Sequence, residues 1–101
     1  MENSALIFEI ALGLSKPWFV KNIKFEEVNN TRELHIYLDF ETGFKFAQED
    51  GFEYSAYDTV DREWQHLNFF EHKCFLHARV PRVKDKAGRV QFQEVPWARK
   101  G

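Results

Sequence analysis

Two stretches of the chain alternate apolar and polar residues with the period of a half-buried β-strand. In the stretch 33–40 we expect the inward side chains to be Leu34, Ile36, Leu38 and Phe40, and the outward ones to be Glu33, His35, Tyr37 and Asp39. In the stretch 72–80 the predicted inward set is His72, Cys74, Leu76, Ala78 and Val80, and the outward set is Lys73, Phe75, His77 and Arg79. The second stretch therefore predicts a strand with one wet, basic face.

The residues before 33 predict a partner strand and a tight turn. Residues 22–28 place Ile23 and Phe25 on one face, and Asn29 and Asn30 favour a turn because asparagine tolerates left-handed backbone. Residues 22–40 are therefore expected to form a β-hairpin.

A short helix is predicted at residues 4–14. Its apolar residues recur at helical spacing: Leu6, Ile7, Ile10, Ala11 and Leu14. Asn3 or Ser4 can cap its first turn, and Pro17 prevents its continuation. Because so short a helix is marginal alone, it must dock on the rest of the domain.

The remaining apolar runs predict further strands. Short strands are expected on either side of 47–51, and longer ones at 64–70 and 74–80, separated near Glu71. A final hairpin is predicted from 79–84 and 89–95 around a turn at 85–88. The fold class is therefore α+β: one domain, residues 1–101, with a short N-terminal helix followed by a mostly antiparallel β domain.

Composition favours a compact, aromatic-rich domain in a reducing compartment. The 101 residues include 11 Phe, 3 Trp and 3 Tyr, which can fill a small core. The single cysteine, Cys74, excludes an internal disulfide and fits the cytoplasm. No apolar run approaches the roughly 20 residues of a membrane helix, and the N-terminus lacks the positive region of a signal peptide. We therefore expect a soluble, cytoplasmic protein without a membrane partner.

Charge is divided unevenly along the chain. Residues 1–61 carry 5 Lys and Arg against 12 Asp and Glu, a balance of −7. Residues 62–101 carry 9 against 4, a balance of +5, and the two sum to the net −2. The basic half can either meet an anionic partner such as nucleic acid or pair with the acidic half inside the fold.

Basic residues in the last third are the candidates for DNA contact. Two strands and a turn would present them within a short distance, as phosphate contacts require. The predicted DNA-binding residues are Lys73, His77, Arg79, Arg82, Lys84, Arg89, Trp97, Arg99 and Lys100, and Lys86 belongs to the same basic set. Trp97 can either stack on a base or cover the β core after Pro96.

Catalytic and metal-binding patterns are weak. Cys74 and His77 have metal-ligand spacing, but residues three apart on a strand face opposite sides, so we expect a buried structural cysteine and an exposed histidine. Carboxylate pairs such as Glu26 and Glu27 are interpreted as solvated surface charge. With no phosphate loop and no nucleophile–base pattern, we expect no enzyme, no metal and no cofactor.

Five ordered blocks of sequence resemble a known family. The blocks are 34–40 (LHIYLDF), 57–59 (YDT), 64–70 (WQHLNFF), 76–84 (LHARVPRVK) and 95–99 (VPWAR). They resemble the N-terminal domain of bacterial transposases of the ISL-three insertion-sequence family, over roughly residues 8–101. The resemblance implies a zinc-finger-like domain, related to a zinc ribbon, that binds the terminal inverted repeats of the element. In full-length members a helix-turn-helix segment and a two-metal catalytic domain follow.

The zinc ligands of that family are missing from this sequence. The resemblance places its two ligand pairs at Ala47 and Asp50, and at Asp85 and Gly88. Two aspartates alone cannot make a tetrahedral zinc site. The resemblance thus implies a degenerate, metal-free zinc ribbon, either an excised domain or a short relic, in which packing replaces the metal.

Three functional hypotheses follow. The first is a non-catalytic transposase domain that binds DNA through its basic C-terminal hairpin during transposition. The second is a docking module, which self-associates or contacts a transposase catalytic domain. The third is a remnant without activity.

Overall fold

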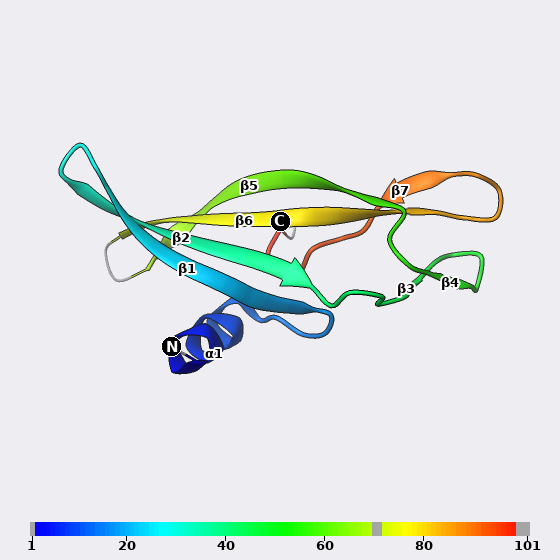
Figure 1. Ribbon diagram of the computed structural model, residues 1–101, viewed down its shortest axis with the longest axis horizontal. Coiled ribbons are helices and arrows are strands. Elements are labelled where there is room, and N and C mark those ends of the chain that lie inside the picture. The colour runs from blue at the N-terminus through cyan, green and yellow to red at the C-terminus, as the bar shows by residue number, and fades with distance from the viewer. Residues whose placement is uncertain (1, 70–71, 99–101) are drawn as a thin grey trace.

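The computed structural model describes residues 2–69 and 72–98, with side chains for 5–65 and 72–98. The described residues form one helix, α1 (Glu2–Leu12), and seven strands (Figure 1): β1 (Trp18–Val28), β2 (Thr31–Phe40), β3 (Phe46–Ala47), β4 (Glu53–Tyr54), β5 (Asp58–Phe69), β6 (His72–Lys84) and β7 (Val90–Phe92). The molecule is elongated, measuring 51 × 26 × 25 Å. The predicted α+β class is confirmed.

One five-stranded sheet forms the body of the molecule. Its order is β1-β2-β6-β5, and β7 pairs with the last residues of β6. The β1–β2, β5–β6 and β6–β7 pairs are antiparallel, which confirms the mostly antiparallel prediction. β2 and β6, however, run parallel, with Ile36 opposite Leu76. Hairpin signals report only pairs of consecutive strands, so the sequence did not predict this central pairing.

The β1–β2 hairpin has the turn that its sequence predicts. Asn29 and Asn30 adopt φ angles of 52° and 65°, the left-handed pair that matches the twist of the strands. β1 begins at Trp18 rather than at Asn22, with a register shift between Val20 and Asn22.

Helix α1 is confirmed, but its packed side differs from the stripe that predicted it. Phe8 and Leu12 are buried against the sheet, whereas Leu6, Ile7 and Ile10 are 54%, 57% and 71% exposed. The sequence predicted that the helix docks, but its periodicity did not distinguish which of its apolar residues would reach the core.

Two local interactions fix how α1 ends and where it docks. Gly13, at φ 68°, closes the helix, and the Leu14 amide donates to the Glu9 carbonyl at 2.9 Å. The Glu9 carboxylate accepts a 2.9 Å hydrogen bond from the Val20 amide of β1. The helix is therefore held against β1 by a polar contact as well as by apolar packing (Figure 1).

The core lies on one face of the sheet, between the sheet and α1. The fully buried members lie on β2 and β6: Leu34, Ile36, Cys74, Leu76, Pro81 and Val83. The segment after β7 also packs on this face, because the Trp97 ring meets the rings of Trp18 at 4.9 Å and Trp64 at 5.4 Å. We call the opposite side of the central strands, which carries the outward residues of β2 and β6, the open face.

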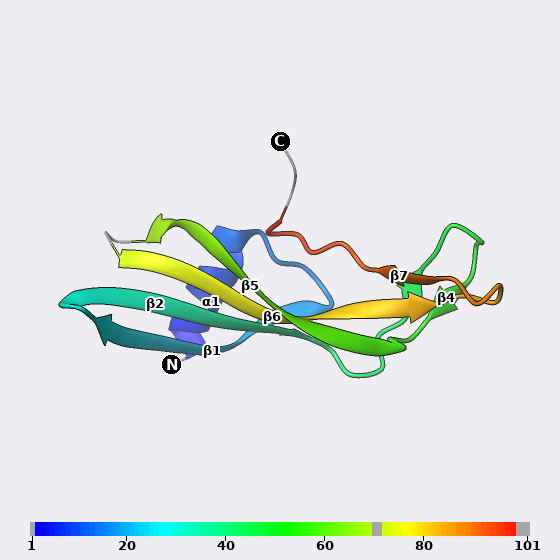
Figure 2. The same ribbon diagram turned by 90° about the horizontal axis from the view of Figure 1, so that it is seen from above.

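Beyond this body, β3 and β4 form a separate two-stranded hairpin near the β6–β7 turn (Figure 2). The short strands predicted on either side of 47–51 are thereby confirmed. Helix α1 has 11 residues, which is too short to cross a bilayer. No membrane-spanning helix is found among the residues that the structure describes.

Candidate functional site

The predicted DNA-binding residues do not form one patch. Lys73 lies near the start of β6 and Lys84 at its end, so about 36 Å of strand separates them at about 3.3 Å per residue. The expectation that the set lies within a short distance is wrong, because β6 is one continuous strand of 13 residues. Arg99 and Lys100 lie outside the described residues.

Several of these cations are paired with carboxylates. On the open face Arg79 donates to Asp39 at 2.9 Å, and Arg82 forms a two-pronged ion pair with Asp58. That hydrogen-bonded pair lowers the pKa of Asp58 and raises the pKa of Arg82. Asp39 and Asp58 belong to the acidic half of the sequence. The charge division is therefore partly neutralised within the fold, as the second interpretation of the charge pattern expected.

A second group of cations covers aromatic rings at the end of the molecule that holds the β6–β7 turn. Arg62 and Arg82 lie over the Phe92 ring at 4.5 and 5.7 Å, Lys84 lies over Tyr57 at 5.3 Å, and Lys86 over Phe52 at 3.5 Å. The three rings are themselves 45–56% exposed. We call this surface the cationic end, and it consists of Arg62, Arg82, Lys84, Lys86, Arg89, Phe52, Tyr57 and Phe92.

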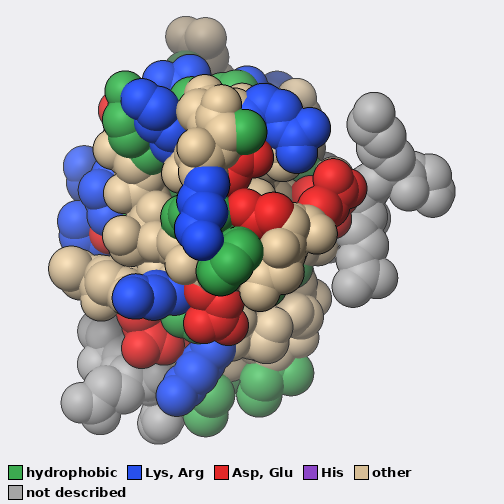
Figure 3. Space-filling view, turned by 90° about the vertical axis from the view of Figure 1, so that its right-hand side faces the viewer, with side chains coloured by type: hydrophobic (Ala, Val, Ile, Leu, Met, Phe, Trp, Pro, Cys, Tyr) green, Lys and Arg blue, Asp and Glu red, His purple; other side chains and the backbone are tan. Residues whose placement is uncertain are grey.

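Figure 3 looks directly onto this end of the molecule. Lys and Arg side chains surround it, with acidic side chains between them. Arg89 shares its turn with Asp85 and pairs with it at 3.4 Å. The cationic end is therefore a mixed surface on which positive groups and exposed rings alternate with carboxylates.

The two turns where the resembled family would hold zinc do lie side by side. The Tyr54 hydroxyl donates to Asp50 at 2.5 Å and accepts from the Lys86 amide at 3.2 Å, which joins the β3–β4 hairpin to the β6–β7 turn. Gln48 donates to Gln93 at 3.0 Å across the same junction. The hydrogen bond from Tyr54 lowers the pKa of Asp50 and raises the pKa of Tyr54. Hydrogen bonds of polar side chains therefore join the two turns that a zinc ion would connect in the resembled family.

Trp97 and Cys74 have structural positions. Of the two roles predicted for Trp97, the structure favours packing, because its ring lies between Trp18 and Trp64 and its Nε1 is buried without a partner among the described residues. Cys74 is fully buried, and burial raises the pKa of its thiol to about 11. It faces away from His77, so the prediction of a buried structural cysteine is confirmed.

Four rings are arranged in the middle of the open face. The parallel register sets His35 beside Phe75 and Tyr37 beside His77. The His77 ring stacks on Tyr37 at 4.5 Å, and His35 stacks on Phe75 at 5.1 Å. His35 Nδ1 and His77 Nε2 are 2.8 Å apart, so the two imidazoles share a hydrogen bond between neighbouring strands.

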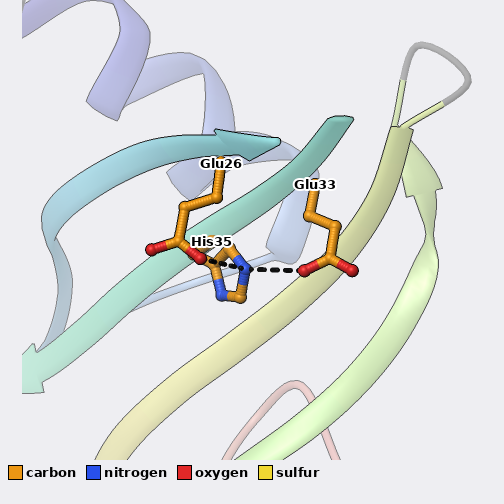
Figure 4. Close-up of side chains that lie close together, drawn as sticks. All are labelled: Glu26, Glu33 and His35. Carbon is orange, nitrogen blue, oxygen red and sulfur yellow. Dashed lines mark hydrogen bonds and ion pairs between the residues drawn. The ribbon is translucent and has the colours of Figure 1, made fainter. Parts of the chain in front are cut away.

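Carboxylates stand at both outer ends of this histidine pair. His35 Nε2 is 3.1 Å from Glu33 Oε1 and 3.4 Å from Glu26 Oε1 (Figure 4), while His77 Nδ1 is 3.5 Å from Glu63 Oε1. We call this arrangement the histidine face: Glu26, Glu33, His35, Tyr37, Glu63, Phe75 and His77. Glu26 is exposed, as the sequence analysis expected, and the β1–β2 register also brings its carboxylate to His35.

Both side chains of the histidine pair are largely buried, and burial shapes the protonation of His77. The side chain of His35 is 12% exposed and that of His77 is 23% exposed. Desolvation is the main cause that lowers the pKa of His77, against the opposing effect of Glu63. The neutral imidazole is therefore favoured at His77 near neutral pH.

Sequence reasoning missed the histidine face as a site. The outward positions of both strands were predicted, His35 and His77 among them. The expectation that His77 is exposed is wrong, because its ring packs on Tyr37 and its side chain is half-buried. What was missing was the parallel pairing of β2 with β6. The alternation placed an imidazole on the outward face of each strand, but nothing in the sequence indicated that these two strands are neighbours.

Comparisons with known proteins found no relative of this chain. No protein-family model matches the chain. Neither the curated proteins nor the solved structures contain a match to it. The resemblance to the ISL-three transposases therefore rests on the five sequence blocks alone.

Proposed function

We propose that this chain is a non-catalytic DNA-binding domain of the kind found at the N-terminus of a transposase, and that it contacts DNA through the cationic end. The observation that carries the proposal is the placement of cations over exposed rings. Lys84 lies on Tyr57 and Lys86 on Phe52, with both lysines and both rings reaching the surface.

This combination suits nucleic acid for two physical reasons. Lysine and arginine neutralise phosphates and release counterions, which gives affinity without sequence information. Exposed rings offer platforms for unstacked bases, each worth about 1–3 kcal/mol in stacking. A duplex supplies the phosphates for the cations, and a base that leaves the stack can use the rings.

The cations at this end differ in how free they are to contact phosphate. Arg82 is engaged by Asp58, and Arg89 by Asp85. Lys84 and Lys86 contact rings instead, and their ammonium groups carry no comparable ion pair among the described side chains. We assign the main phosphate contacts to these two lysines, and a supporting role to Arg62 and Arg89.

A salt titration with a matched charge control tests the proposal. Binding of a fluorescent duplex carrying the element's end sequence is measured by anisotropy at several salt concentrations. Lys84→Ala/Lys86→Ala should reduce the slope of log K against log salt by about 1.8, because each phosphate that is no longer neutralised removes about 0.9 from the slope. Lys21→Ala/Lys24→Ala removes the same charge from β1 and should leave the slope unchanged. Absence of binding at low salt, or an equally reduced slope in both variants, contradicts the proposal.

A second candidate function is self-association through α1. Leu6, Ile7 and Ile10 form an exposed apolar face on this helix. The nearby Glu9 carboxylate is turned to the Val20 amide. A second copy of the chain could therefore bury this face without opposing charges. The residues fit the docking hypothesis, and the occupant we propose is another copy of the domain.

Sedimentation analysis distinguishes this candidate from an isolated monomer. The unsubstituted chain should form a concentration-dependent dimer, and Ile7→Lys/Ile10→Lys should remain monomeric because it places charge in the interface. Phe52→Lys, which adds charge to an apolar site at the other end of the molecule, serves as the control. A monomer at all concentrations removes self-association and leaves the DNA proposal untouched.

A further inference from the structure

The β1–β2 hairpin gathers two carboxylates and one imidazole on the open face. Glu26 comes from β1, and Glu33 and His35 come from β2, with one ligand atom of each within 4.8 Å of the others. Figure 4 shows the two glutamates reaching toward the same nitrogen of His35. We propose that these three residues bind a single divalent transition-metal ion of the zinc type.

Two of the three ligand-to-ligand distances are close to those of a zinc site, and all three lie within 4.8 Å. Zinc lies about 2.0–2.1 Å from nitrogen and oxygen ligands, which places tetrahedral ligands about 3.3 Å from each other. His35 Nε2 is 3.1 Å from one carboxylate oxygen and 3.4 Å from the other. The ring of His35 can therefore stay in place while the exposed Glu26 side chain adjusts to an ion between them.

Register makes a cation useful at this position. Glu26 and Glu33 are directly opposite each other in the antiparallel β1–β2 ladder. Like charges in opposite cross-strand positions destabilise a sheet, so this hairpin needs positive charge between them. A divalent ion would balance both carboxylates, whereas a protonated His35 would balance one.

His77 lies behind His35 and can fix the orientation of its ring. Imidazoles that bind metal almost always donate their other ring N–H to a second group, which fixes the ring. Here His35 Nδ1 meets His77 Nε2 at 2.8 Å, and His77 Nδ1 meets Glu63 at 3.5 Å. A metal on His35 Nε2 leaves the Nδ1–H of His35 to donate to His77 Nε2, so the second strand fixes the orientation of the ligand ring.

Ligand number and exposure indicate the kind of site. Three protein ligands leave a fourth position for water, as in sites that are open to exchange. The Glu26 side chain is 46% exposed, which gives an ion access from solvent. Because one ligand is an imidazole, the site should prefer zinc or cobalt to magnesium or calcium. This site is separate from the two turns that correspond to the zinc ligands of the resembled family.

Calorimetry on the untagged chain, stripped with a chelator and desalted, tests the proposal. Titration with zinc chloride should give saturable binding of one equivalent. Glu26→Gln and Glu33→Gln should each weaken it at least tenfold. Glu27→Gln removes the same charge from the adjacent residue of β1 and should bind as the unsubstituted chain does. No saturable binding, equal weakening by Glu27→Gln, or equally strong binding of magnesium overturns the inference.

Nuclear magnetic resonance of the imidazoles identifies the ligand. Zinc should shift the ring resonances of His35 and His77 but leave those of His72 in place. His77→Phe should weaken binding about 10–100-fold because it removes the acceptor behind His35, and His77→Gln should restore part of the affinity. Circular dichroism of each metal-free variant checks that the fold is retained. Shifts at His72 together with more than one equivalent of zinc would show scattered surface binding and refute the site.

Discussion

The cationic end and the histidine face share strand β6, but the molecule holds their side chains in different ways. At the cationic end the side chains come largely from turns and strand ends, and they reach over exposed rings. Arg89, for example, has a side chain that is 61% exposed. At the histidine face the side chains come from the middle of adjacent strands, and the His35 side chain is only 12% exposed.

This difference indicates which kind of ligand each region suits. Phosphate recognition tolerates mobile side chains, because a cation acts as a point charge over several ångströms. Metal ligation requires ligand atoms placed to within a few tenths of an ångström, which hydrogen-bonded strands can supply. The end of strand β6 therefore carries mobile cations that suit phosphate, and its centre carries side chains in fixed positions that suit a metal ion.

The largest expected effect is on the core that supports both regions. Leu76 is fully buried on β6, opposite Ile36 and Trp64. Leu76→Ala should lower the free energy of unfolding by about 2–5 kcal/mol, because it leaves a cavity. Urea denaturation measures the change. Phe92→Ala, on the cationic end, should cost less than about 1 kcal/mol, and an equal cost would contradict the assignment of the core.

The next effect separates the two regions from each other. Zinc at 100 times its dissociation constant should add about 2.7 kcal/mol to the stability of the unsubstituted chain. Thermal unfolding should show that Glu33→Gln removes most of this stabilisation and that Lys84→Ala/Lys86→Ala keeps it. The salt dependence of DNA binding should show the reverse. If one variant abolishes both responses, the regions are not independent.

Acid should weaken the cationic end through Asp58. The pKa of this carboxyl is lowered by its hydrogen bonds from Arg82, so the pair stabilises the fold above the unfolded pKa of about 3.9. That contribution disappears as pH falls through the lowered folded value. Asp58→Asn should therefore show a smaller decrease in stability between pH 5 and pH 2 than the unsubstituted chain, measured by urea denaturation. Identical acid profiles would mean that the pair contributes nothing.

The smallest expected effect concerns the junction of the two turns. Tyr54→Phe removes the hydroxyl that accepts from the Lys86 amide. Hydrogen exchange of the Lys86 backbone amide should become faster, while that of the Leu76 backbone amide in the core stays the same. Unchanged exchange at Lys86 would show that the turns are held by other contacts, among them the bond between Gln48 and Gln93.

Much of the fold could be predicted because its signals are local. The two asparagines of the β1–β2 turn, the alternation in β2 and the alternation in β6 each act within a few residues. The side of α1 that packs could not be predicted, because Phe8 and Ile7 are both strongly apolar and only the sheet selects between them. The spread of the basic residues was also missed, since the length of β6 depends on its three partner strands.

The sequence by itself determined which side chains of β2 and β6 point outward, because alternation along a strand is a property of the backbone. It also determined that the two turns carry Ala47, Asp50, Asp85 and Gly88 at the positions where the resembled family would hold zinc. Only the tertiary structure decided that His35 meets His77, which lies 42 positions away in the chain, and that Glu63 stands behind them. The physical reason is that these contacts depend on the parallel register of β2 with β6 and on the β5–β6 ladder, neither of which any local pattern specifies.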